Sequence, residues 1–207
     1  MDNQYTMRIA VSGTAGIGKT TLARSLAPLL KLEYISENYE RFFEQPGTFK
    51  KPHSELIPIF QQVFEQKSAQ ERLSVNFITD RCPVDLFHLW MTHGLGEDLQ
   101  QTRRFFDQCL KQARSYDFLI LSAWGSIALN QKEDSGNCQR RVMNPWTQLR
   151  NHAAIVGYSY LWLPAEKIIQ LPMPLSDPEQ RLHFTLEQIK LRLEHAQAPR
   201  SPADQEG

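Results

Sequence analysis

The sequence predicts an α/β fold, in which a single three-layer domain carries helices on both faces of a parallel sheet. A glycine-rich segment at residues 13–20 lies between an expected strand and an expected helix, which is the order found in phosphate-binding loops. Strand and helix patterns then alternate along a chain of 207 residues, a length that suits one such domain. The strand pattern at 118–121 is continuously apolar, which is typical of parallel strands buried on both sides.

Five short strands are expected, and helices fill most of the intervals between them. The strands cover residues 7–12, 32–35, 75–80, 117–122 and 167–172. The helices cover residues 21–27, 55–73, 84–92, 99–113, 146–163 and a last segment that begins at 176–179. Leu56, Ile59 and Phe60 have helical spacing, and Pro58 is expected in the first turn of their helix. We assign residues 1–195 to one domain and 196–207, rich in Pro, Ala and polar residues, to a disordered tail.

The composition argues against several classes of protein. The formal net charge is zero, which makes nucleic acid an unlikely general partner. The apolar runs are too short to cross a bilayer and the N-terminus lacks a signal pattern, so we expect a cytoplasmic location and no membrane contact. Cys82, Cys109 and Cys138 lack metal-ligand spacing and are interpreted as reduced thiols. Nothing in the sequence indicates the oligomeric state.

The segment at residues 13–20 matches the Walker A pattern G-x-x-x-x-G-K-[ST] at every fixed position. Its backbone N–H groups and the following helix N-terminus are suited to hold a polyphosphate, which predicts ATP binding. Lys19 would reach the β- and γ-phosphates, and Thr20 would hold Mg²⁺. A chance match is disfavoured, because both flanks also fit. The expected nucleotide-binding residues are Gly13, Thr14, Ala15, Gly16, Ile17, Gly18, Lys19, Thr20 and Thr21.

Asp80 and Arg81 follow the third expected strand directly, at the end of the strand where ligands bind in open α/β sheets. Asp80 could hold the hydrated Mg²⁺ opposite Thr20, which makes these two residues the expected metal pair. Arg81 could meet an anionic group of the substrate. The alternative is that an acid at a strand end simply lies in a solvated turn.

Glu37 occupies the matching place after the second strand. It could orient or deprotonate the hydroxyl group of a phosphate acceptor, and Arg41 could bind an acceptor anion. The alternative for Glu37 is a solvated surface acid. Tyr39, Phe42 and Phe43 could line an aromatic acceptor pocket, although core packing is the favoured role for at least one of the two phenylalanines.

A polar excursion at about residues 130–145 follows the fourth strand and is expected to form a lid. Arg140 or Arg141 could bring a cation to the transferred phosphoryl group when such a segment closes and excludes water. Arg150, at the start of the next helix, is a third candidate. The alternative is an ordinary basic surface loop, and the sequence does not distinguish among the three arginines.

Taken together, these motifs resemble the P-loop kinase group, and within it the AAA-domain ATPases related to thymidylate kinases and nicotinamide-riboside kinases. The resemblance extends from about residue 7 to about 193 and implies a P-loop NTPase fold with a five-stranded parallel sheet in the order 2-3-1-4-5. It also implies the acceptor role for Glu37 and the Asp-Arg role for Asp80 and Arg81. The lid departs from the family pattern Asp-Gly-x-Arg, because residues 137–139 separate Gly136 from Arg140.

The leading functional hypothesis is a kinase that transfers the γ-phosphoryl group of ATP to a small molecule, such as a nucleoside or nucleotide. A carboxylate with only one nearby arginine favours a hydroxyl acceptor over a phosphate acceptor. The alternative is a regulatory ATPase that acts as a nucleotide-dependent switch on a protein partner. A GTPase is disfavoured, because the sequence lacks an Asn-Lys-x-Asp motif.

Overall fold

The computed structural model describes residues 6–37, 39–43, 47–125, 144–173 and 175–197. Its centre is a parallel sheet of five strands in the order β2-β3-β1-β4-β5, which confirms the order that the family resemblance predicts. The strands are β1 (Arg8–Ser12), β2 (Glu33–Ile35), β3 (Phe77–Asp80), β4 (Phe118–Leu121) and β5 (Ile168–Gln170). Because all of them run in one direction, their carboxyl ends meet at one edge of the sheet.

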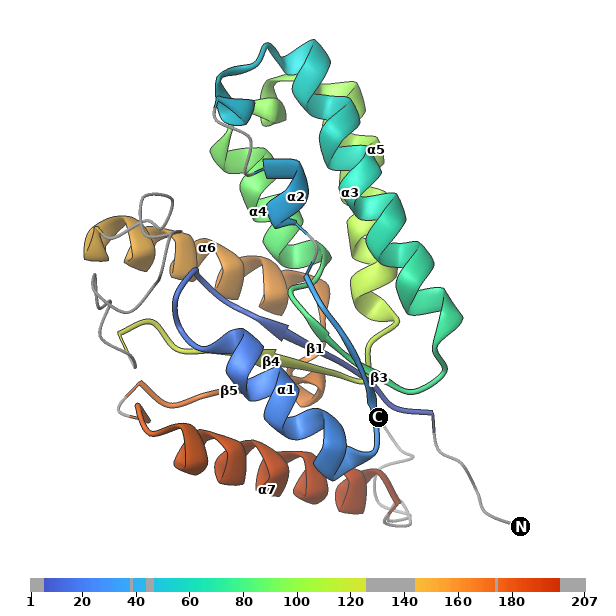
Figure 1. Cartoon of the computed structure of the whole chain (residues 1–207), viewed down its shortest axis with the longest axis vertical. Coiled ribbons are helices and arrows are strands. Elements are labelled where there is room, and N and C mark those ends of the chain that lie inside the picture. The colour runs from blue at the N-terminus through green and yellow to red at the C-terminus, as the bar shows by residue number, and fades with distance from the viewer. Residues whose placement is uncertain (1–5, 38, 44–46, 126–143, 174, 198–207) are drawn as a thin grey trace, which may run out of the picture.

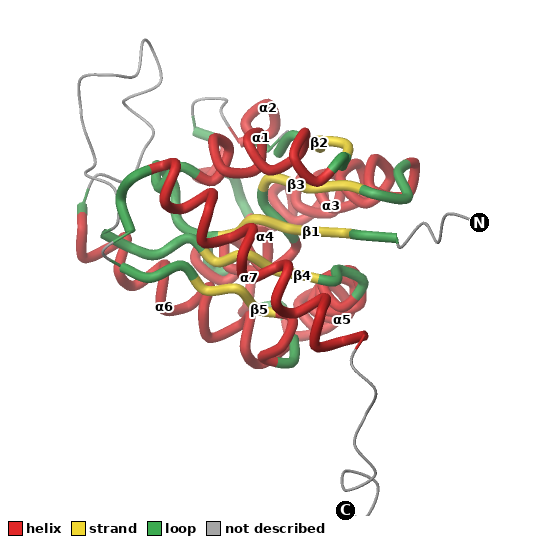
Figure 2. The backbone as a smooth tube through the Cα atoms, turned by 90° about the horizontal axis from the view of Figure 1, so that it is seen from below, coloured by secondary structure: helices red, strands yellow, loops and turns green. Residues whose placement is uncertain are grey.

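Helices cover both faces of the sheet, as Figure 1 and Figure 2 show from two directions. One face carries α1 (Lys19–Leu30) and α7 (Pro178–Gln197). The other face carries α3 (His53–Leu73), α4 (Pro83–Thr92), α5 (Leu99–Arg114) and α6 (Pro145–Trp162). The short elements are α2 (Glu40–Phe43) and the 3₁₀ turns η1 (Thr48–Lys50), η2 (Leu95–Glu97) and η4 (Ala165–Lys167). The predicted three-layer arrangement is therefore confirmed.

Two hydrophobic clusters, one on each side of the sheet, hold the layers together. Alternate residues of a strand point to opposite faces, so Ile9 and Val11 join the cluster with α1 and α7 while Ala10 joins the other. The second cluster is rich in aromatic rings, and its Phe60 meets Trp90 edge-on with 5.7 Å between ring centroids. This contact packs α3 against α4, two helices that contribute residues to the site described below.

The helix boundaries differ from the expectation in two informative places. α1 begins at Lys19 rather than at residue 21, so the last residues of the glycine-rich segment already belong to the helix. The prediction that Pro58 lies in the first turn of its helix is wrong. Pro52, in extended conformation, precedes a helix that begins at His53, and Pro58 therefore falls in the second turn.

Several expectations concern residues outside the described ranges. Arg140, Arg141, Cys138 and most of the expected lid at 130–145 fall within residues 126–143 and are not described. α7 continues through Gln197, past the start of the expected tail at 196, and residues 198–207 are again outside the description. Among the described helices, none combines the length and the apolar character that crossing a membrane requires.

Candidate active site

The glycine-rich segment forms a loop, here called the donor loop, that joins the carboxyl end of β1 to α1. Gly13 has φ +138°, and a Cβ atom there would lie 2.7 Å from Ile17 Cδ1 and 3.1 Å from the Ser122 carbonyl oxygen. Gly16 and Gly18 have φ of 77° and 76°, in the left-handed region that side chains rarely adopt. This backbone therefore favours glycine at all three positions, of which Gly13 and Gly18 are fixed in the Walker A pattern, and the loop leads directly into the N-terminus of α1.

Lys19 folds back across the donor loop. Its ammonium group donates a hydrogen bond of 2.6 Å to the carbonyl oxygen of Thr14, and its side chain is only 5% exposed. Burial, together with the positive charge of Arg81, lowers the pKa of Lys19 from its ordinary value to about 8, while Asp85 and Asp80 act in the opposite direction. The loop thus holds a buried amine whose charge a bound polyphosphate would stabilise.

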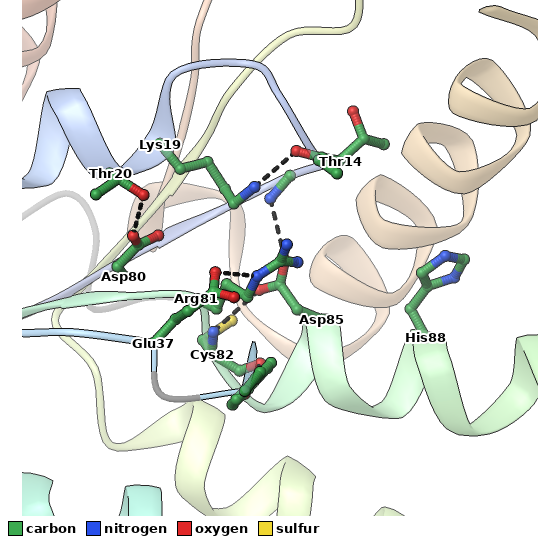
Figure 3. Close-up of polar contacts among 12 residues, drawn as sticks. Thr14, Lys19, Thr20, Glu37, Asp80, Arg81, Cys82, Asp85 and His88 are labelled. Carbon is green, nitrogen blue, oxygen red and sulfur yellow. Dashed lines mark hydrogen bonds and ion pairs between the residues drawn. The ribbon is translucent and has the colours of Figure 1, made fainter. Parts of the chain in front are cut away.

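Thr20 and Asp80 face each other at the carboxyl edge of the sheet, where Figure 3 shows the Thr20 hydroxyl donating to Oδ2 of Asp80. The other carboxylate oxygen of Asp80 is buried and has no hydrogen-bond partner among the described residues. A hydroxyl and a carboxylate are oxygen ligands of the type that Mg²⁺ prefers. Since the described residues contain no cluster of three or more His, Cys, Asp or Glu side chains, phosphates and water would supply the remaining ligands.

Glu37 and Arg81 form an ion pair that joins the ends of β2 and β3, two segments 44 positions apart in the sequence. Arg81 has φ 62°, which is unusual for a residue with a side chain, and its N–H donates to the Val11 carbonyl oxygen at 2.9 Å. Burial alone would lower the pKa of Arg81, but Glu37 and Asp85 raise it above its usual value. Its guanidinium group is therefore a fixed cation beside the donor loop.

Asp85 is a residue of the site that the sequence analysis missed. It is 1% exposed at the start of α4, and one carboxylate oxygen accepts from the Cys82 N–H at 3.0 Å. Its other oxygen accepts from the Gly13 N–H at 3.3 Å and lies 3.8 Å from Nη1 of Arg81. The available signal was its position three residues after Cys82, which is the spacing of a helix capping box.

Lys67 is a second residue that the sequence analysis missed. It is 5% exposed in α3, and its ammonium group donates to the carbonyl oxygens of Ser36 at 2.8 Å and of Asp80 at 3.0 Å. These two carbonyls belong to the residues directly before Glu37 and Arg81, so one side chain ties together the backbones that carry both. Burial lowers the pKa of Lys67. A lysine on the buried face of an expected helix was the available signal.

Two helices outside the Walker A pattern also hold the donor loop. Gln148 of α6 donates to the Ala15 carbonyl oxygen at 3.1 Å, and Arg181 of α7 donates to that of Ile17 at 2.8 Å. Arg181 is buried, which lowers its pKa, and its Nε and Nη2 have no hydrogen-bond partner among the described residues. Sequence reasoning had no means to connect these distant residues with the loop.

The other predicted residues take different places. Thr21 is exposed in the first turn of α1, and the backbone of Arg41 lies in α2. Arg150 is exposed on α6 and contributes to a lowered pKa of His88, for which burial is the main cause. Figure 3 shows His88 standing apart from the ion pairs.

The aromatic residues after β2 serve the core as well as the site. Tyr39 is 4% exposed and donates from its hydroxyl to the Cys82 carbonyl oxygen at 3.3 Å. Phe43 packs on Phe60 with ring centroids 4.9 Å apart, so the expectation of core packing holds for one phenylalanine. The Arg81 guanidinium lies 6.0 Å from the Tyr39 ring centroid, which places this ring beside the ion pair.

The sheet order and the donor loop define the chain as a P-loop NTPase. Residues 8–168 match the family model of an AAA domain, so the chain belongs to that family, as its resemblance predicted. A Pyrococcus abyssi (strain GE5 / Orsay) protein named "Putative adenylate kinase" is 32% identical over 101 residues. That match covers 46% of this chain and 55% of the relative, so the chain is matched to about half of the relative's length.

Solved structures of several kinases share the fold. A deoxyadenosine kinase from M. mycoides superposes with a TM-score of 0.64 at 16% identity, over 89% of this chain and 99% of its own. The NadR protein in complex with NR gives 0.66 at 16% identity, over 91% of this chain and 52% of its own. Thymidylate kinase from Candida albicans gives 0.60 at 14% identity, over 91% and 93%. At these identities the likeness establishes the fold alone.

Proposed function

We propose that the protein is an ATP-dependent kinase that transfers the γ-phosphoryl group to a small molecule, most simply a nucleoside or a nucleotide. One observation carries this proposal: the Glu37–Arg81 ion pair lies at the same edge of the sheet as the donor loop and the Thr20–Asp80 pair (Figure 3). A site that only hydrolysed ATP would need the donor loop and a metal pair. The carboxylate–arginine pair beside them offers groups that can orient and deprotonate an acceptor hydroxyl.

In the proposed reaction the chain mainly positions and neutralises charge. The loop N–H groups and Lys19 bind the β- and γ-phosphates, and Lys19 neutralises the charge that moves onto the leaving oxygen. Glu37 takes the proton of the acceptor hydroxyl as its oxygen bonds to the γ-phosphorus and the bond to the β–γ bridging oxygen breaks. Arg81 fixes the direction of the Glu37 carboxylate. Mg²⁺, held by Thr20 and Asp80, would supply Lewis-acid neutralisation of the phosphate oxygens.

A hydroxyl acceptor fits this corner better than a phosphate acceptor. A phosphate is already ionised and calls for several cations, whereas the described corner offers one arginine, and that arginine is paired with a carboxylate. One protein with the same fold is named a deoxyadenosine kinase, and that name refers to a nucleoside. We therefore propose a nucleoside-like acceptor.

A panel of acceptors tests the proposal. Purified protein with Mg-ATP is mixed with nucleosides, nucleotides and other small hydroxyl compounds, and ADP release is followed together with the phosphorylated product. We expect one chemical group of acceptors to raise ADP release well above the rate with water alone. ATP turnover that no acceptor stimulates would instead support the regulatory ATPase, whose test is a protein partner that changes the rate.

A further inference from the structure

Asp85 touches both halves of the site through a single carboxylate oxygen. Its Oδ1 accepts from the N–H of Gly13, the first residue of the donor loop, at 3.3 Å. The same oxygen lies 3.8 Å from Nη1 of Arg81, whose Nε is paired with Glu37 on the acceptor side. Figure 3 shows Asp85 beside Arg81 and near the donor loop. Arg81 thus interacts with two carboxylates, Glu37 on the acceptor side and Asp85 on the donor side.

The backbone around this oxygen leaves little room for independent movement. The Arg81 N–H donates to the Val11 carbonyl oxygen at 2.9 Å, so the turn after β3 is also fixed to the end of β1. Gly13 is closely packed against Ile17 and Ser122. A change in the charge near Asp85 Oδ1 therefore alters its hydrogen bond with the Gly13 N–H, because neither group can move to a solvent-exposed position. Asp85 is 1% exposed, and in such a poorly solvated position charges interact strongly.

We propose that Asp85 is a positioning residue that couples Glu37 and Arg81, here called the acceptor corner, to the donor loop. The ion pairing of Arg81 then sets the affinity of the loop for ATP. The proposal rests on the proposed function for its acceptor and for ATP binding, and on the structure for the contacts of Asp85. An acceptor that engages Glu37 or Arg81 redistributes the charge of Arg81 between the two carboxylates. By reciprocity, ATP binding then changes acceptor affinity by the same factor.

The charges that act on Lys19 agree with this arrangement. Arg81 lowers the pKa of Lys19 and Asp85 raises it, so the two members of the pair act in opposite directions on the same phosphate-binding ammonium group. Removing either member alone therefore shifts the balance of charges that acts on Lys19. A residue that served only as the N-terminal cap of α4 would not produce this dependence, because capping stabilises the helix regardless of the state of Arg81.

The test is a double-mutant cycle that needs no acceptor. The dissociation constant of Mg-AMP-PNP is measured by calorimetry for wild type, Arg81→Met, Asp85→Asn and the double variant. Asp85→Asn keeps the shape and one accepting oxygen but removes the charge. We expect the effect of the double variant to depart from the product of the single effects by at least about 5-fold. Effects that multiply within about 2-fold would overturn the coupling.

A matched control is available on α5. Arg103 and Asp107 form an ion pair of 3.0 Å at the same i, i+4 spacing, but both side chains are exposed. The cycle Arg103→Met with Asp107→Asn should leave Mg-AMP-PNP affinity unchanged. If that cycle departs from additivity as much as the first, the effect at Asp85 is not specific and the proposal fails.

Two outcomes separate this proposal from the proposed function. Wild type that does not bind Mg-AMP-PNP overturns both, whereas tight binding with multiplicative effects overturns the coupling alone. Circular dichroism and urea titration check that each variant folds. If Asp85→Asn does not fold, the cycle is run with Asp85→Glu, which keeps the charge and moves it by one methylene; coupling predicts a departure of at least about 2-fold there, and multiplicative effects again overturn it.

Discussion

The donor loop and the acceptor corner of this site meet the same edge of the sheet but are built in opposite ways. The donor loop is one uninterrupted segment, residues 13–20, whose shape is set by the backbone conformation of its glycines. The acceptor corner combines Glu37 and Arg81 from the segments that follow β2 and β3. Lys67, from a helix between those strands in the chain, fixes both segments. A site formed by one segment can be recognised as a motif in the sequence, whereas a site formed by several distant segments exists only once the chain has folded.

The largest expected effect is on the donor side. Lys19→Ala should lower acceptor-dependent turnover by about 10²–10³-fold or more, because it removes a cation that stabilises charge developing in the transition state. The measurement is ADP release with the best acceptor of the panel, with circular dichroism to verify the fold. Lys51→Ala, at a partly exposed position outside the site, is the control. Turnover near that of wild type would rule out the proposed donor role.

A smaller and more selective effect is expected on the acceptor side. Lys67→Met removes the link between the Ser36 and Asp80 carbonyls, so Glu37 and Arg81 lose their fixed separation. We expect kcat/KM for the acceptor to fall by up to about 100-fold, because a small misplacement of reacting groups is costly. The Kd of Mg-AMP-PNP should change by a smaller factor, because Arg81 keeps its own contacts with Val11 and Asp85. Lys111→Met, at an exposed position of α5, should change neither quantity. Equal losses in both quantities would contradict the division between donor and acceptor sides.

The lowered pKa of Lys19 makes the donor side sensitive to pH. In the free protein Lys19 is charged below about pH 8 and loses its proton above it, and only the charged form attracts phosphates. We expect Mg-AMP-PNP affinity to weaken by roughly 10-fold per pH unit well above that value, with proton uptake on binding. Calorimetry in buffers of different ionisation enthalpy measures the uptake. Lys19→Arg should remove this pH dependence, and a slope unchanged in that variant would assign it to another group.

The smallest effect concerns support of the donor loop from outside the motif. Arg181→Met removes the hydrogen bond to the Ile17 carbonyl oxygen and should weaken Mg-AMP-PNP binding by only about 5-fold. A hydrogen bond from a charged donor contributes about 1.5–3 kcal/mol, and only part of that acts on the nucleotide, because Arg181 holds the loop from outside. Urea titration should show little loss of stability, because a buried cation without a hydrogen-bonded carboxylate is removed as well. A loss beyond about 100-fold would mean that Arg181 contacts the nucleotide itself.

The difference between a contiguous donor loop and an acceptor corner built from distant segments also decides what could be predicted from the sequence. The donor loop, the strand order and the placement of Asp80 and Arg81 at a strand end follow from local patterns and from the family that those patterns resemble. Lys67 and Asp85 could not be predicted as parts of the site, because their partners are set by how α3 and α4 pack on the sheet. The place of Pro58 within its helix was predicted wrongly for a local reason. α3 begins at His53, directly after Pro52, and not at residue 55 as expected.

The place of β2 in the sheet has a consequence for motion. β2 is an edge strand of only three residues, paired on one side with β3, and Glu37 follows it closely. β1, which leads into the donor loop, is central and paired on both sides. Opening of a strand requires fewer broken hydrogen bonds at an edge, so we expect amide hydrogen exchange to be faster along β2 than along β1. Glu37 therefore follows an edge strand that opens more readily than the central strand leading into the donor loop.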